Sequence, residues 1–147
     1  MTTDDTVRTD LRGHGLKATP KRLAVAGLFL SRRGSMTPEA VWQRLRPQLG
    51  ELGLPTVYRI LEDLVRVGLL TRVELEDRVL RYAVCRAEPG THHHHLVCVS
   101  CGNVGEVDDC SFEREVRRVE RRTGFRVLSH RLQIDGICSA CRRPRKR

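Results

Sequence analysis

The sequence predicts an α+β fold in two parts, in which a helical N-terminal half ending in a β-hairpin precedes a smaller, metal-binding half. Three observations carry this prediction. Apolar residues recur at helical spacing through the first half, two short strand-like runs follow them, and five of the six cysteines and five of the six histidines lie after residue 85. The length of 147 residues suits one domain or two small ones.

Three helices are expected in the first half, each with a recognisable start or stop signal. Pro20 opens the first helix, Thr37 is a suitable N-cap for the second with Pro38 in its first turn, and Gly68 is a natural stop for the third. Their expected extents are 20–30, 37–50 and 57–67.

A β-hairpin should follow the third helix, with strands over 69–75 and 78–84 joined by Glu76 and Asp77. Helices followed by a hairpin predict a winged helix-turn-helix over residues 1–85.

The third helix is a candidate reader of DNA. In a helix-turn-helix the second helix of the motif enters the major groove with its N-terminal residues against base edges. Those residues would be Thr56, Tyr58 and Arg59. An arginine donates two hydrogen bonds to guanine, and an aromatic ring packs on a thymine methyl. A plain amphipathic helix with a polar outer face explains the same pattern equally well.

The remaining chain divides into a hinge, a core and a tail. The Pro89-Gly90 pair predicts a turn within a hinge over 86–91. Residues 92–141 form the metal-binding half, and the basic run 142–147 is expected to be a disordered tail.

Composition limits the partners and the compartment. The formal net charge of +9 favours a polyanionic partner such as a nucleic acid. No apolar run is long enough for a membrane span, and the polar, acidic N-terminus is unlike a signal peptide. The expected compartment is therefore the cytoplasm, where six cysteines are better explained by metal than by disulfides.

Two Cys-x-x-Cys pairs form the strongest chemical signal. Such pairs hold two thiolates on a tight turn, and two pairs complete the tetrahedral coordination of a structural Zn²⁺. The candidate ligands are Cys98, Cys101, Cys138 and Cys141. The 36 residues between the pairs exceed the usual spacing of zinc ribbons, and a redox dithiol pair or four unrelated thiols are the alternatives.

Four successive histidines, His92–His95, precede the first pair. If this run is extended, His92 and His94 face one way and His93 and His95 the other, so that one tetrapeptide supplies two metal sites.

Further ligands must come from elsewhere, and Glu106, Glu113 and His130 are the candidates. Glu113 lies at the start of a helix expected over 112–122, and His130 lies on the apolar face of a strand expected over 125–134. A histidine on such a face is more often a core residue than a ligand.

Two cysteines remain outside the Cys-x-x-Cys pairs. Cys110 precedes Ser111, a plausible N-cap, and its interpretation is packing. Cys85 closes the hairpin and is either a small buried residue or a soft ligand across the hinge.

Together these residues resemble the ferric uptake regulator family of bacterial metal-sensing repressors. The most specific motifs are Thr56-Val-Tyr-Arg59 and His92–His95 followed by Leu-Val-Cys-Val-Ser-Cys-Gly102. Further matching segments lie at 15–22, 55–61, 67–70, 81–82 and 136–138, so that the resemblance covers nearly the whole chain.

The resemblance implies a homodimer with an N-terminal winged helix and a C-terminal dimerisation domain, which binds palindromic double-stranded DNA operators when loaded with metal. It implies no membrane, no small-molecule substrate and no enzymatic activity. It places Lys17 and Arg22 near the DNA backbone or minor groove.

The same resemblance assigns the ligands to three sites. Cys98, Cys101, Cys138 and Cys141 match the structural zinc site. The site within the dimerisation domain is matched by His92, His94, Glu113 and His130. The sensing site at the hinge is matched in part by His93, His95 and Glu106.

At the hinge the sequence departs from the iron-sensing pattern. The histidine expected before the second predicted helix is replaced within Gly34-Ser35-Met36, and Ala83 stands where a glutamate is expected. Cys85 occupies a position similar to the cysteine ligand of zinc uptake regulators, and Glu74 is a weaker candidate. Because thiolate and imidazole favour Zn²⁺ over the harder Mn²⁺ and Fe²⁺, the sequence predicts a zinc-responsive repressor.

Three other functions fit parts of the sequence. An iron- or manganese-sensing repressor of the same family is the nearest. A zinc hydrolase would need an open coordination position for water, and an RNA-binding zinc ribbon is disfavoured by an aromatic content of only 4%.

Overall fold

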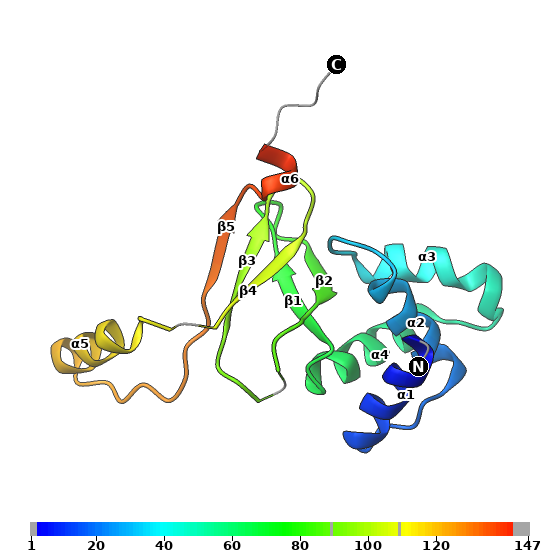
Figure 1. Ribbon diagram of the computed structural model, residues 1–147, viewed down its shortest axis with the longest axis horizontal. Helices are drawn as coiled ribbons and strands as arrows, with labels where there is room; N and C mark the ends of the chain where they lie inside the picture. Colours follow the sequence, from blue (N-terminus) through cyan, green and yellow to red (C-terminus); the bar gives the residue numbers. More distant parts are fainter. Residues whose placement is uncertain (1–2, 89, 109, 143–147) are drawn as a thin grey trace.

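The computed structural model describes residues 3–88, 90–108 and 110–142. Four helices come first, then a two-stranded sheet, then a three-stranded sheet with two further helices (Figure 1). The elements are α1 Thr3–Gly13, α2 Pro20–Leu30, α3 Pro38–Leu49, α4 Leu54–Arg66, β1 Leu70–Glu74, β2 Leu80–Val84, β3 His94–Cys98, β4 Val104–Val107, α5 Glu113–Thr123, β5 Gln133–Gly136 and α6 Ser139–Arg142.

The three predicted helices of the first half are confirmed as α2, α3 and α4. Thr19 and Thr37 cap α2 and α3 by accepting hydrogen bonds from Arg22 N–H and Ala40 N–H, which satisfies amide groups that a helix start leaves free. Helix α4 begins earlier than expected, so that Thr56 lies within its first turn.

Helix α1 was not predicted, because its sequence is mostly polar. Among the residues of α1 whose burial is described, 5–13, only Val7 and Leu11 are buried, at 3% and 0% exposure. They are four residues apart and therefore lie on one face, which packs against the other helices.

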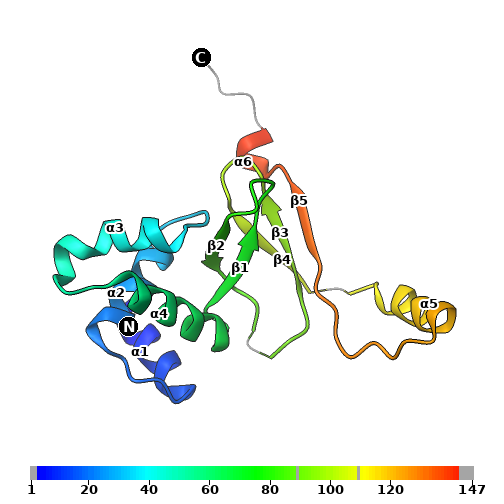
Figure 2. The same ribbon diagram turned by 180° about the vertical axis from the view of Figure 1, so that it is seen from behind.

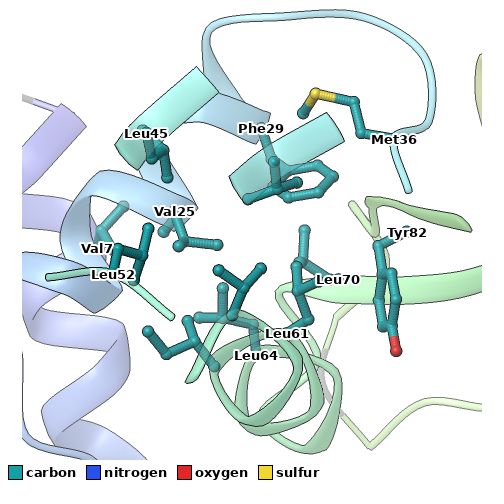
Figure 3. Close-up of a cluster of buried hydrophobic side chains, with 14 of the residues drawn as sticks. Val7, Val25, Phe29, Met36, Leu45, Leu52, Leu61, Leu64, Leu70 and Tyr82 are labelled. Carbon is teal, nitrogen blue, oxygen red and sulfur yellow. The ribbon is translucent and has the colours of Figure 1, made fainter. Parts of the chain in front are cut away.

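Apolar side chains from all four helices and the hairpin meet in one core (Figure 3). Val25 and Phe29 of α2 lie beside Leu61 and Leu64 of α4, and Leu70 of β1 closes the cluster. This core fixes the orientation of α4, whose opposite face is exposed.

The predicted hairpin is confirmed as β1 and β2, an antiparallel pair in which Leu70 is opposite Val84. Helices followed by this hairpin form the predicted winged helix-turn-helix. The wing is attached to α4 through Glu62, whose carboxylate accepts a hydrogen bond from Tyr82 Oη and forms an ion pair with Arg72.

The second sheet has the order β4-β3-β5, with β4 antiparallel and β5 parallel to the central strand. The predicted helix over 112–122 is confirmed as α5. The strand predicted over 125–134 is wrong, because only Gln133–Gly136 pairs with β3. Phe125 and Leu128 are 75% and 86% exposed and pair with no described strand, so the apolar alternation did not produce a strand there.

The helical half and α5 lie on opposite sides of the two sheets (Figures 1 and 2). Arg142, assigned to the tail, ends α6, and the rest of the predicted tail, 143–147, lies outside the described residues. None of the described helices is long and apolar enough to cross a membrane.

Candidate metal centres

Three groups of cysteine and histidine side chains converge within the described residues. In each group the possible ligand atoms all lie within 4.8 Å of one another. The groups are Cys98, Cys101, Cys138 and Cys141; Cys85, His93 and His95; and His92, His94, Cys110 and His130.

The four-cysteine group joins the turn after β3 to α6. Cys101 Sγ lies 3.8 Å from Cys138 Sγ, and a tetrahedral site with Zn–S bonds of about 2.3 Å places its sulfurs about 3.8 Å apart. All six cysteines are free. The spacing therefore fits a zinc ion, although the two pairs are far apart in sequence.

Hydrogen bonds and burial shift the pKa values of two thiols of this group in opposite directions. The Cys138 N–H donates to Cys98 Sγ over 3.3 Å and, with further backbone donors, lowers the pKa of Cys98 to about 6. Burial and the neighbouring thiols raise the pKa of Cys101 to about 12. A thiolate is the form that binds metal, and the backbone donors already favour it at Cys98.

Alternate histidines of the run His92–His95, which leads into β3, belong to different groups, as the alternation of an extended chain predicts. His93 and His95 join Cys85, whereas His92 and His94 lie with Cys110 and His130. The run His92–His95, at the start of β3, therefore supplies imidazoles to two separate groups.

The group of Cys85, His93 and His95 lies between the two halves of the chain. Cys85 Sγ is 3.3 Å from His93 Nε2 and 3.7 Å from His95 Nε2. The Cys85 N–H donates to Leu69 O at the start of the wing. Two cavities, of about 390 Å³ and about 490 Å³, are each lined by residues of both halves. The second of these cavities is lined by Val65 of α4 and by both histidines.

The ring orientation of His93 suits a ligand. Its Nδ1 lies 2.9 Å from Thr91 O, and donation to that carbonyl leaves Nε2, the atom that faces Cys85, with its lone pair free. Burial, followed by repulsion from His93, lowers the pKa of His95, so its neutral, metal-binding form persists to lower pH. Burial raises the pKa of the Cys85 thiol.

The two candidate carboxylates for this group differ in placement. Glu106 lies opposite His95 in the ladder between β3 and β4, and its Oε1 accepts a hydrogen bond of 2.7 Å from the Arg86 N–H. Glu74 contacts Gln133 through its backbone. Neither the Glu106 carboxylate nor the Glu74 carboxylate belongs to any of the three groups among the described residues.

The third group differs from the predicted ligand set. Cys110 was interpreted as packing, yet its Sγ lies 3.0 Å from His94 Nε2 and 3.3 Å from His130 Nε2. Glu113 is exposed at the start of α5 and does not belong to the group. His130 is half-buried and faces the other ligands, so it is not an enclosed core histidine.

The candidate DNA-binding residues lie on the helical half. Arg59 is exposed on α4 and forms no ion pair with any other described residue, and Lys17 is exposed in the loop before α2. Thr56 lies in the first turn of α4, and Tyr58 Oη donates a hydrogen bond of 2.9 Å to Glu39.

Arg22 has a different environment from the one expected for a DNA contact. Its guanidinium pairs with Asp63 of α4 at 2.6 Å and donates to Lys17 O at 2.9 Å. With 22% of its side chain exposed, Arg22 joins α2 to α4.

Comparison with known proteins identifies a family. Residues 13–135 match the model of the ferric uptake regulator family. The ferric uptake regulation protein of Bordetella parapertussis is 35% identical over 139 residues, which is 94% of this chain and 98% of that protein.

Two solved structures have the same fold. A zinc uptake regulator complexed with zinc and DNA is 24% identical, with 96% of each chain covered and a TM-score of 0.76. The ferric uptake regulator of Francisella tularensis with iron is 28% identical, with 88% of this chain and 96% of that chain covered and a TM-score of 0.57.

Proposed function

Because this chain belongs to the ferric uptake regulator family, we propose that it is a zinc-responsive transcriptional repressor that binds palindromic operators as a homodimer in the cytoplasm. Members of this family regulate transcription and are not enzymes, so the zinc hydrolase considered from the sequence is wrong.

The observation that carries the zinc assignment is the group of Cys85, His93 and His95. One thiolate and two imidazoles are donors that favour Zn²⁺, whereas Mn²⁺ and Fe²⁺ in regulatory sites favour oxygen. Glu106, the cross-strand neighbour of His95, is the best available fourth ligand and would close a tetrahedral site.

The placement of these ligands supports a mechanism. Cys85 follows the wing strand β2, whereas His95 belongs to the strand β3 of the second half and His93 directly precedes that strand. Bound zinc supplies a cross-link between them. The Cys85 N–H is bonded to Leu69 O at the start of the wing, and α4 packs on that wing. A metal held by these ligands would therefore restrict the orientation of α4 relative to the dimerisation half. A metal shifts such an equilibrium by binding one orientation more tightly than the other.

An iron- or manganese-responsive repressor is the second candidate, and one observation favours it. The Bordetella relative, at 35% identity, is a ferric uptake regulation protein. The cysteine in the hinge group is the feature that argues for zinc.

The test is operator binding by Cys85→Ala, titrated against buffered free Zn²⁺, Fe²⁺ and Mn²⁺. We expect the wild type to respond to Zn²⁺ at the lowest free concentration, and the variant to need at least about tenfold more zinc, since even outer ligand partners typically contribute 10–100-fold to affinity. An unchanged zinc midpoint in Cys85→Ala would make Cys85 a packing residue and favour the iron or manganese sensor.

Two matched variants identify the carboxylate. Glu106→Gln and Glu74→Gln remove one negative charge each without changing side-chain size. We expect only Glu106→Gln to raise the zinc midpoint. If Glu74→Gln raises it instead, the fourth ligand comes from the wing.

A further inference from the structure

We propose that Cys110 is the fourth ligand of a second, permanently closed zinc site with His92, His94 and His130, and that Glu113 is not a ligand. This site is separate from the hinge group, and the proposal holds whichever metal the hinge group senses.

The distances match those of a tetrahedral site. For Zn–N bonds of about 2.0–2.1 Å and a Zn–S bond of about 2.3 Å, sulfur and nitrogen ligands lie about 3.5 Å apart and two nitrogens about 3.3 Å apart. Cys110 Sγ is 3.0 Å from His94 Nε2 and 3.3 Å from His130 Nε2, and the Nε2 atoms of His92 and His94 are 3.2 Å apart. Each ligand therefore presents its donor atom to one common point.

The arrangement of the rings supports the same conclusion. The ring centroids of His92 and His130 are 4.5 Å apart, and those of His92 and His94 are 4.7 Å apart, with edge-to-face geometry in both pairs. His94 is only 4% exposed. The Nε2 atoms of three imidazoles converge here with one thiol sulfur. These four groups cannot all satisfy one another as hydrogen-bond donors and acceptors. One cation, in contrast, accepts a lone pair from each of them.

The path of the chain explains why Cys110 and not Glu113 is close. Cys110 lies between β4 and α5, where the chain passes beside β3. Glu113 is the first residue of α5, and this helix leads away from the sheets (Figure 1). Glu113 and His130 both line a hollow beside α5, but the Glu113 carboxylate is not among the converging ligand atoms.

The ligand set also determines the chemistry of the site. Three imidazoles and one thiolate occupy all four positions of a tetrahedral zinc, as in structural sites, and leave none for water. Replacing a carboxylate by a thiolate moves the preference further from Mn²⁺ and Fe²⁺. This centre is thus selective for zinc through its own donors.

The site has a structural consequence for α5. Cys110 and His130 bracket the segment 111–129, which contains α5, and both are attached through the site to β3. Helix α5 has no buried residue of its own, so little packing holds it in place. Metal at this site fixes both ends of the segment to the sheet.

The experiment uses Co²⁺ as the probe in full-length protein carrying Cys85→Ala, with the four-cysteine site left filled by zinc. In this background Cys110 is the only remaining candidate thiolate ligand outside the four-cysteine site. We expect bound Co²⁺ to show the near-ultraviolet absorption of a thiolate-to-cobalt charge transfer and the visible bands of tetrahedral Co²⁺.

Two further variants in this background separate the candidate ligands. Adding Cys110→Ser should abolish the charge-transfer absorption and weaken Co²⁺ binding by at least about tenfold. Adding Glu113→Gln should leave both unchanged. The opposite pattern, with metal lost in Glu113→Gln and an unchanged spectrum in Cys110→Ser, would overturn the proposal.

A measurement on the wild-type chain covers the case in which Cys110→Ser fails to fold. Zinc should protect Cys110 from alkylation by iodoacetamide, as mapped by peptide mass, and a chelator should expose it. Equal alkylation of Cys110 with and without zinc contradicts the proposal. Neither readout depends on DNA binding, so the outcome is independent of the zinc response proposed for the hinge.

Discussion

At the scale of single residues, Glu62 connects α4, the proposed reading helix, to the wing. Its carboxylate accepts the Tyr82 hydroxyl over 2.5 Å and pairs with the Arg72 guanidinium. The bond to Arg72 is the main cause of a lowered pKa at Glu62. Burial, followed by the bond to Glu62, raises the pKa of Tyr82 to about 12. The ring of Tyr82 is 1% exposed, so its hydroxyl has few other partners.

Removing this hydroxyl should weaken the fold modestly. We expect Tyr82→Phe to lower the free energy of unfolding by about 1 kcal/mol, since a net hydrogen bond contributes about that much and Glu62 is partly exposed to solvent. Denaturant unfolding of metal-loaded protein measures it, with Tyr58→Phe, whose hydroxyl contacts Glu39 on the exposed surface, as the matched control. A larger loss in the control would contradict this assignment.

The same pair predicts a pH dependence. Because the pKa of Glu62 is lowered on folding, its contribution to stability is present above its unfolded pKa of about 4.3 and is lost as the pH falls through the folded pKa. The difference in unfolding free energy between wild type and Tyr82→Phe should therefore shrink below pH of about 4. A difference that grows on acidification would contradict the charged form of Glu62 as the partner.

At the scale of secondary-structure elements, α4 and β3 each divide two tasks between two faces. The inner face of α4 fills the core with Leu61 and Leu64, whereas Arg59 remains exposed. Strand β3 divides its histidines between two metal groups. In both elements the repeat of the backbone, 3.6 residues in a helix and 2 in a strand, determines which side chains share a face.

The exposed face of α4 predicts how DNA affinity responds to mutation. Arg59→Ala should weaken operator binding by about 1–3 kcal/mol and relax the base preference at one position, because an arginine on a base edge contributes that much to discrimination. Arg66→Ala, at the other end of α4 and paired with Asp63, is the matched control and should leave base preference intact. Binding measured against operators with single base changes checks this. Equal affinity in Arg59→Ala and wild type would contradict the docking of α4 in the groove.

At the scale of the whole molecule, the four-cysteine centre is also a contact between the halves. A Cβ on Gly102, whose φ is +69°, would meet Ser35 Oγ, and one on Gly34, whose φ is +92°, would lie 2.8 Å from Cys101 O. The turn at the cysteines therefore packs directly on the loop between α2 and α3, where a Cβ on Gly34 would clash with backbone. Gln133 donates to Glu74 O across the same boundary.

Loss of the four-cysteine zinc should therefore affect both halves. Structural zinc in small peptides contributes about 10–16 kcal/mol of apparent binding free energy, which matches or exceeds the total stability of a typical domain, about 5–15 kcal/mol. We expect Cys101→Ser to lose one zinc per chain, to become monomeric or aggregated and to lose operator binding. Metal analysis and sedimentation measure this, with Ser100→Ala in the same turn as the control. Normal dimers of Cys101→Ser with one zinc fewer would contradict it.

The sequence by itself was sufficient for features set by local spacing. Pro20 predicted α2, and Thr37 with Pro38 predicted α3. The paired cysteines predicted one thiolate cluster. The alternation of His92–His95 predicted two groups of ligands. Each of these depends on residues a few positions apart, whose relative directions follow from backbone geometry alone.

Only the tertiary structure decided which distant side chains meet. Cys110, rather than Glu113, faces the histidines, because the course of the chain between β4 and α5 determines which residue passes beside β3. Arg22 pairs with Asp63 because α2 packs across α4. Residues 125–132 form no strand despite their alternation, because a strand needs a hydrogen-bonding partner, and β3 already pairs with β4 and with Gln133–Gly136.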